Sequence, residues 1–106
     1  MSAPGESPGL VLVPDRFAVQ VGGREVVLTA TQFRLLDLLV REPGRIFSRT
    51  ELMEQGIGTL VTERTVDVHI KDLRRNLGPH GSRIETVRGR GYRFRSESAH
   101  QQHIDV

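Results

Sequence analysis

Cations recur at helical spacing on one side of residues 62–77. At about 100° per residue, a helix over this segment gathers an apolar stripe, formed by Val66, Ile70, Leu73 and Leu77. Its opposite side is mainly cationic and consists of Arg64, Val68, Lys71 and Arg75. Guanidinium groups bind guanine edges and phosphates through a planar fork, and an exposed valine can meet a thymine methyl group. This pattern indicates a helix that lies in the major groove of duplex DNA.

A second group of cations surrounds a glycine-rich turn. Arg88, Arg90 and Arg93 alternate there with Gly89 and Gly91. An arginine at the tip of a projecting hairpin can enter a narrow minor groove, where the negative potential is strongest. Taken alone, this segment is better explained as a surface hairpin with scattered charges, but its position directly after the cationic helix favours DNA.

Positive charge is concentrated in residues 62–95. This segment holds eight arginines and one lysine against four acidic residues, a net charge of +5, whereas residues 1–61 carry −1 and residues 96–106 carry −2. Such a distribution indicates an anionic partner, with a solvated basic face as the alternative. No apolar run approaches the roughly 18 residues that span a bilayer. We expect no partner at a membrane surface either, because a helix followed by a hairpin does not resemble an interfacial anchor.

The composition narrows the class of protein. A length of 106 residues predicts one domain, and the absence of cysteine excludes disulfides and thiolate metal sites, which fits a cytoplasmic protein. We expect no enzyme, because no Ser/His/Asp set or carboxylate pair stands out. We expect no metal or cofactor either, since the histidines His100 and His103 lie in a polar tail.

Turn and cap signals predict the elements that position these cations. Short extended segments at 10–13, 17–21 and 25–28 predict a small antiparallel sheet, because Pro14-Asp15 and Gly22-Gly23 separate them. Thr29-Ala-Thr-Gln32 and Ser48-Arg-Thr-Glu51 are capping boxes, which satisfy free backbone donors at a helix start. The predicted helices run to about Glu42, to about Gly56, and from Thr62 to the stop signal Gly78-Pro79.

The remaining segments predict a hairpin and two irregular ends. Strands at 83–87 and 92–95 would enclose the arginine-rich turn. Residues 1–9 are rich in serine, proline and glycine and predict a disordered lead or linker. The polar residues 96–106 predict a disordered tail, so the domain itself would occupy residues 10–95.

Five motifs together resemble the winged-helix effector domain of OmpR/PhoB-type response regulators. They are Leu28-Thr29, Phe33-x-Leu35-Leu36, Ser48-Arg49-x-Glu51-Leu52, Arg64-Thr65-Val66-Asp67-Val68-His69-Ile70-x-x-Leu73-Arg74 and Thr86-Val87-Arg88-Gly89-x-Gly91-Tyr92-Arg93. The resemblance covers roughly residues 10–95, and the last two motifs are highly specific in combination.

The resemblance implies an α+β fold, a winged helix-turn-helix with an N-terminal antiparallel sheet of four strands, three helices and a C-terminal β-hairpin wing. It also implies a bacterial, two-component transcription regulator that is nucleoid-associated when bound. The recognition helix, 62–77, would lie in the major groove, and the wing, 83–95, would place Arg88 in the minor groove. Members of this family usually bind direct repeats as head-to-tail dimers and contact RNA polymerase through the loop before the recognition helix.

Besides Arg88 in the minor groove, the predicted DNA-binding residues have two main roles. Phosphate contacts are expected from Arg64, His69, Lys71, Arg74, Arg75 and Tyr92. Base edges would be read by Val68, with Asp67, Lys71 or Asp72 as further candidates. The whole predicted set is Arg64, Thr65, Asp67, Val68, His69, Lys71, Asp72, Arg74, Arg75, Arg88, Gly89, Arg90 and Tyr92.

Two positions depart from the family's pattern. The loop at 56–61 is short and has Ile57 where the family often has tryptophan, and Asp72 stands where close relatives often place a base-reading residue. Asp72 has two readings, as an acceptor for cytosine N4 or as a partner that orients Arg75, and we favour the second. His69 likewise either donates to a phosphate or is buried and satisfied.

Two alternatives remain to this reading. In one, a winged helix uses its basic face to bind an acidic protein, and in the other the chain is a stand-alone regulator without a receiver domain. No acidic pocket with a partner lysine marks a phosphorylated receiver domain, and we expect a separated effector domain rather than a stand-alone regulator.

Overall fold

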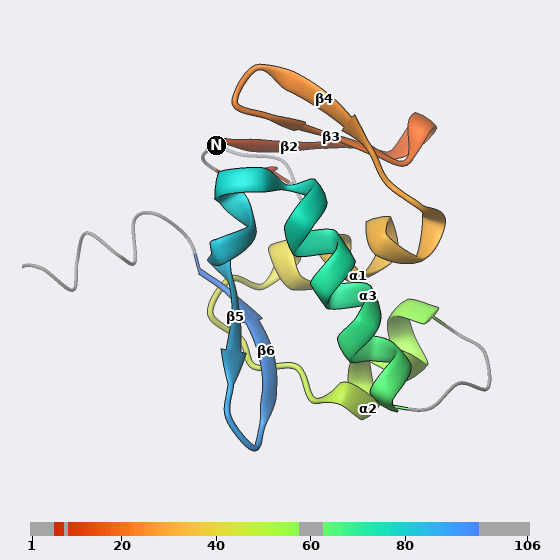
Figure 1. Cartoon of the computed structure of the whole chain (residues 1–106), viewed down its shortest axis with the longest axis vertical. Helices are drawn as coiled ribbons and strands as arrows, with labels where there is room; N and C mark the ends of the chain where they lie inside the picture. Colours follow the sequence, from red (N-terminus) through yellow and green to blue (C-terminus); the bar gives the residue numbers. More distant parts are fainter. Residues whose placement is uncertain (1–5, 8, 58–62, 96–106) are drawn as a thin grey trace, which may run out of the picture.

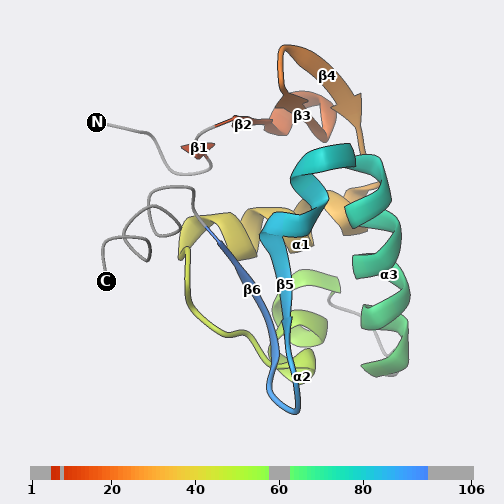
Figure 2. The ribbon, with the colours of Figure 1, turned by 60° about the vertical axis from the view of Figure 1, so that its left-hand side comes forward.

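The computed structural model describes residues 6–7, 9–57 and 63–95, with the side chains of all but residues 6, 7, 57, 63 and 64 (Figure 1). An N-terminal sheet lies at one end of the molecule, the helices follow it, and a C-terminal hairpin projects toward the other end (Figures 1 and 2). This arrangement confirms the α+β winged-helix fold that the sequence predicts.

The N-terminal sheet is antiparallel and follows chain order. Its strands are β1 (Glu6–Ser7), β2 (Leu10–Val13), β3 (Ala18–Val21) and β4 (Arg24–Val27). The 3-10 turn η1 (Pro14–Arg16) joins β2 to β3. Gly22 and Gly23 have φ of 55° and 84°, so they supply the left-handed turn that a two-residue hairpin requires.

The sheet begins earlier than the sequence predicts. Glu6 pairs with Val11 and Ser7 with Leu10, so part of the segment assigned to a disordered lead is a strand. Composition gave no sign of β1, because its pairing uses backbone groups and does not need apolar side chains. Residues 1–5 and 8, and the tail predicted for 96–106, lie outside the described residues.

The first two helices begin at their predicted capping boxes. In α1 (Ala30–Arg41) the Thr29 side chain accepts from the Gln32 backbone amide at 3.1 Å, and the Gln32 side chain accepts from the Thr29 backbone amide at 3.2 Å. The Ser48–Glu51 box does the same for α2 (Arg49–Leu52), which continues into the π-helical turn η2 (Met53–Ile57).

The third helix, α3 (Glu63–Asn76), packs against α1, α2 and the turn η3 (Gly78–Arg83). Its predicted apolar stripe is confirmed: Val66, Ile70, Leu73 and Leu77 have no exposed surface. The predicted start at Thr62 lies outside the described residues, and Gly78 ends the helix with φ of 59°. Among the helices of the described chain, none is long and apolar enough to cross a membrane.

The wing is the hairpin of β5 (Ile84–Val87) and β6 (Gly91–Phe94). Residues 88–90 form its turn, in which the Arg90 amide donates to the Val87 carbonyl at 2.9 Å. On its other edge β6 pairs with the loop before α2, through two backbone bonds between Phe47 and Tyr92 of 2.8 and 2.9 Å. The wing turn and the start of α3 lie at the same end of the molecule, away from the N-terminal sheet (Figures 1 and 2).

Candidate nucleic-acid interface

The outer face of α3 carries the cations that the helical spacing predicts. Lys71 and Arg75 are exposed, and Val68, which precedes them on the same face, is 52% exposed. Burying the apolar stripe against α1 and α2 forces the opposite side of the helix outward. Arg64 lies in the first turn of α3, but its side chain is outside the described part of the chain.

The tip of the wing is also cationic and exposed. Arg88, Gly89 and Arg90 form the turn, and all three are exposed. Within the described chain, no salt bridge joins Arg88 or Arg90 to an acidic group. Gly89 has φ of 76°, a conformation that glycine adopts without strain.

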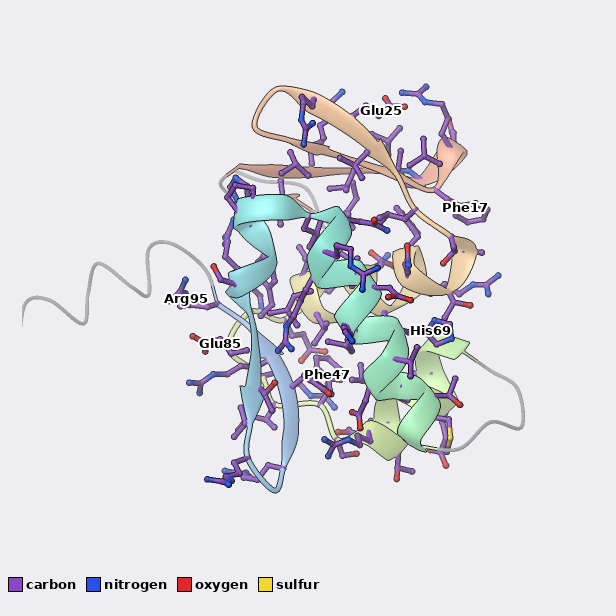
Figure 3. The ribbon with its side chains drawn as sticks, viewed as in Figure 1. Phe17, Glu25, Phe47, His69, Glu85 and Arg95 are labelled. Carbon is purple, nitrogen blue, oxygen red and sulfur yellow. The ribbon has the colours of Figure 1, made fainter. Side chains whose placement is uncertain are left out.

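The base of the wing differs, because its cations are paired. Arg93 Nε donates to Glu85 Oε1 at 2.8 Å, and Arg95 lies 3.6 Å from the other Glu85 oxygen. Two guanidinium groups therefore share one carboxylate where the strands leave the core (Figure 3). The free positive charge of the wing is at its tip.

Arg74 does not point away from the protein, which argues against the predicted phosphate contact. Its Nε donates to the Ile84 carbonyl at 2.9 Å, and its Nη2 donates to Thr86 Oγ1 at 2.8 Å. Its guanidinium also lies 5.5 Å from the centre of the Tyr92 ring. Helical geometry explains the difference, because position 74 falls on the flank of α3 that faces β5.

Tyr92 is likewise occupied within the protein, although a phosphate contact was predicted for it. The residue is only 4% exposed, and its hydroxyl donates to Asp67 Oδ1 at 2.5 Å. Burial, followed by this hydrogen bond, raises the pKa of Tyr92 above its ordinary value. The sequence could not show this, because the two partners are 25 positions apart.

Asp67 joins three elements, which argues against the base-reading role considered for it. Besides Tyr92 of β6, Arg49 of α2 donates to the same Oδ1 atom, from Nε at 2.7 Å. Burial acts to raise the pKa of Asp67, but the hydrogen bonds from Tyr92 and Arg49 outweigh it and hold the pKa below its ordinary value.

The other flank of α3 holds Thr65, His69 and Asp72. Asp72 lies 3.5 Å from Arg75, which agrees with the favoured reading that it orients this arginine. His69 and Thr65 are half-buried (Figure 3 labels His69). The geometry therefore leaves His69 neither fully buried nor fully exposed.

Sequence reasoning missed two arginines. In the sequence Arg49 is marked only as part of a capping motif, yet its guanidinium reaches Asp67 and lies 5.5 Å from the Tyr92 ring centre. Arg83 is 3% exposed, donates from Nε to the Arg95 carbonyl at 3.0 Å and lies over the Phe94 ring. No local pattern marks either contact, because both depend on how the wing folds back.

The sequence is similar to a family of transcriptional regulatory proteins. The family model described as "Transcriptional regulatory protein, C terminal" matches residues 23–94. The phosphate regulon transcriptional regulatory protein PhoB of Escherichia coli K12 is 42% identical over 93 residues, covering 84% of this chain and 41% of that protein. The alkaline phosphatase synthesis transcriptional regulatory protein SphR of Synechococcus elongatus is 40% identical over 102 residues, covering 86% of this chain and 40% of that protein. The chain thus spans about two fifths of the length of these relatives.

Solved structures show the same fold. The DNA-binding domain of CpxR from E. coli has a TM-score of 0.76 at 37% identity, covering 90% of this chain and 98% of that one. The RstA DNA-binding domain of Klebsiella pneumoniae, solved in complex with the RstA box, has a TM-score of 0.73 at 33% identity, covering 85% and 94%.

Proposed function

The chain belongs to the family of C-terminal domains of transcriptional regulatory proteins, and we propose that it binds duplex DNA with α3 in the major groove and the wing tip at the minor groove. The family consists of OmpR/PhoB-type winged-helix domains that bind DNA to regulate transcription, and it is not a family of enzymes. The proposal therefore concerns which residues make the contacts and how the whole regulator is assembled.

The observation that carries this proposal is that α3 and the wing tip both present unpaired cations. Lys71 on α3 and Arg88 and Arg90 on the wing are exposed and have no salt bridge within the described residues. They come from the two elements that reach the same end of the molecule (Figures 1 and 2). A helix and a hairpin that present free cations together match a DNA duplex, where the phosphates attract both.

Each exposed residue then has a distinct role. Lys71 and Arg75 contact phosphates, with Arg64 at the start of α3 and His69 on its flank as further phosphate ligands. Val68 meets a thymine methyl group in the major groove, Arg88 enters the minor groove and Arg90 binds the phosphates beside it. Thr65 lies next to the residues that contact the DNA backbone. Asp72, whose Oδ1 is 3.5 Å from Arg75 Nη1, orients this arginine rather than reading a base itself.

We further propose that the chain is the effector domain of a two-component response regulator. Support comes from relatives of which the chain covers about two fifths, all of them transcriptional regulatory proteins by name. The regulator would act in the bacterial cytoplasm, associate with the nucleoid when bound, and occupy direct repeats as a head-to-tail dimer. A contact with RNA polymerase would involve the loop before α3, of which residues 58–62 lie outside the described residues.

Selection from a random duplex pool, followed by binding titrations at several salt concentrations, tests the proposal. Lys71→Ala should reduce the slope of log K against log salt by about one, because one phosphate contact is lost. The matched control is Arg16→Ala, which removes one cation at the opposite end, where Arg16 pairs with Glu25 at 2.6 Å. Equal slopes for the two variants would contradict the assignment of Lys71. No binding to any duplex at low salt would favour an acidic protein partner instead.

A further inference from the structure

We propose that Asp67 and Tyr92 are positioning residues that hold the wing against α3, so that the major-groove and minor-groove contacts act together. This inference rests on the proposed function, since it assumes that α3 and the wing tip both touch DNA. Its geometric basis is a single carboxylate oxygen, Asp67 Oδ1, that accepts from Tyr92 of β6 at 2.5 Å and from Arg49 of α2 at 2.7 Å. We call Arg49, Asp67, Arg74 and Tyr92 the junction cluster.

The junction cluster ties both strands of the wing to α3. Tyr92 connects β6 to Asp67, while Arg74 connects β5 through the Ile84 carbonyl at 2.9 Å and Thr86 Oγ1 at 2.8 Å. The guanidinium groups of Arg49 and Arg74 each lie 5.5 Å from the centre of the Tyr92 ring. Two cations and a carboxylate thus surround one buried ring, which fixes its direction as well as its depth.

The junction cluster lies close enough to the wing tip that a small tilt of the wing at the cluster changes the position of the tip. Tyr92 pairs with Thr86, which is two residues before Arg88 and thus roughly 7 Å along the strand at about 3.3 Å per residue. A tilt of about 10° at this anchor displaces the tip by about 1 Å, which is enough to disrupt a specific contact in the groove. On α3, Asp67 directly precedes Val68, whose side chain is 52% exposed on the outer face.

A double-mutant cycle separates positioning from plain stability. The affinity for a selected duplex is measured for the wild type, Arg88→Ala, Tyr92→Phe and the double variant. Tyr92→Phe keeps the ring and removes only the hydroxyl donor to Asp67. We expect Arg88→Ala to weaken binding about tenfold in the wild type and only about threefold beside Tyr92→Phe, because the wing no longer holds its tip in the groove.

The matched control uses Glu25→Gln, which breaks a salt bridge in the N-terminal sheet at the far end of the molecule. Its effect should be additive with that of Arg88→Ala. Asp67→Asn, of nearly identical shape, should repeat the Tyr92→Phe result. Circular dichroism at the assay temperature establishes that each variant is folded, so a loss of coupling cannot be a loss of fold.

Two outcomes would overturn the inference, and they differ from each other. An equal loss from Arg88→Ala in the wild-type and Tyr92→Phe backgrounds would show that the cluster does not position the tip. If Arg88→Ala does not lower the affinity even in the wild-type background, Arg88 makes no minor-groove contact. The proposed role of the wing would then be wrong as well. Binding-site selection adds a second readout: Tyr92→Phe should relax base preference at the minor-groove positions and keep it at the major-groove step that Val68 contacts.

Discussion

The junction cluster and the outer cations, Lys71, Arg75, Arg88 and Arg90, both contain arginines, but in opposite situations. In the junction cluster, Arg49 and Arg74 donate to a carboxylate, a carbonyl and a hydroxyl at 2.7 to 2.9 Å. Of the outer cations, Arg75 has a salt bridge of 3.5 Å, and the other three have none within the described part of the chain. The neighbours of a cation therefore decide whether it holds the fold together or is available to a partner.

The largest expected difference in stability is between a glycine next to the junction cluster and a glycine at the wing tip. A Cβ atom at Gly91, where φ is 138°, would lie 2.0 Å from the Phe47 carbonyl oxygen, whereas a Cβ at Gly89 of the tip would meet nothing within 4 Å. Gly91→Ala should lower the free energy of unfolding by about 3 kcal/mol or more, because the wing must leave its anchor. Gly89→Ala should lower it by about 1 kcal/mol, from backbone strain alone. Urea denaturation measures both free energies of unfolding. Equal losses in the two variants would contradict the expectation that only Gly91 is confined by its neighbours.

Two adjacent arginines give the next largest difference. Arg74→Ala should lower the free energy of unfolding by about 2 kcal/mol, because two hydrogen bonds from a charged donor to β5 are lost. Arg75→Ala should change it by less than about 0.5 kcal/mol, since its salt bridge to Asp72 is long and exposed. In DNA titrations the salt slope should fall with Arg75→Ala. A larger loss of stability from Arg75→Ala than from Arg74→Ala would reverse the assignment of the two residues.

The smallest expected effect is on the pH dependence of stability. The pKa of Tyr92 is raised above its ordinary value of 10.0, so the unfolded chain releases this proton first and stability falls as the pH rises above that value. The pKa of Asp67 is lowered from 3.8, so its contribution is present above that pH and is lost as the pH falls through the lowered pKa. Urea denaturation across the alkaline range should show a shallower decline for Tyr92→Phe than for the wild type. A decline of the same steepness in both would exclude the Tyr92 hydroxyl as its source.

The features predicted correctly from sequence are those that depend on near neighbours. The two capping boxes involve residues three positions apart, and the apolar stripe of α3 repeats within one helix, so both follow from local geometry. The junction cluster was missed because Arg49 and Tyr92 reach Asp67 across 18 and 25 positions. Residue type alone suits Arg74 and Tyr92 to phosphate contacts equally well. Only the fold reveals that other groups already occupy them.

The backbone pairing of Phe47 with Tyr92 has a consequence for how new binding preferences can arise in this domain. The wing is fastened along its base, by this pairing and by a bond of 2.8 Å from the Gly44 amide to the Phe94 carbonyl. The three turn residues, 88–90, take no part in these bonds, and their one backbone hydrogen bond in this set lies within the turn. A library that randomises Arg88 and Arg90 should therefore yield mostly folded proteins, so new DNA preferences can be sampled at the tip without first repairing the fold.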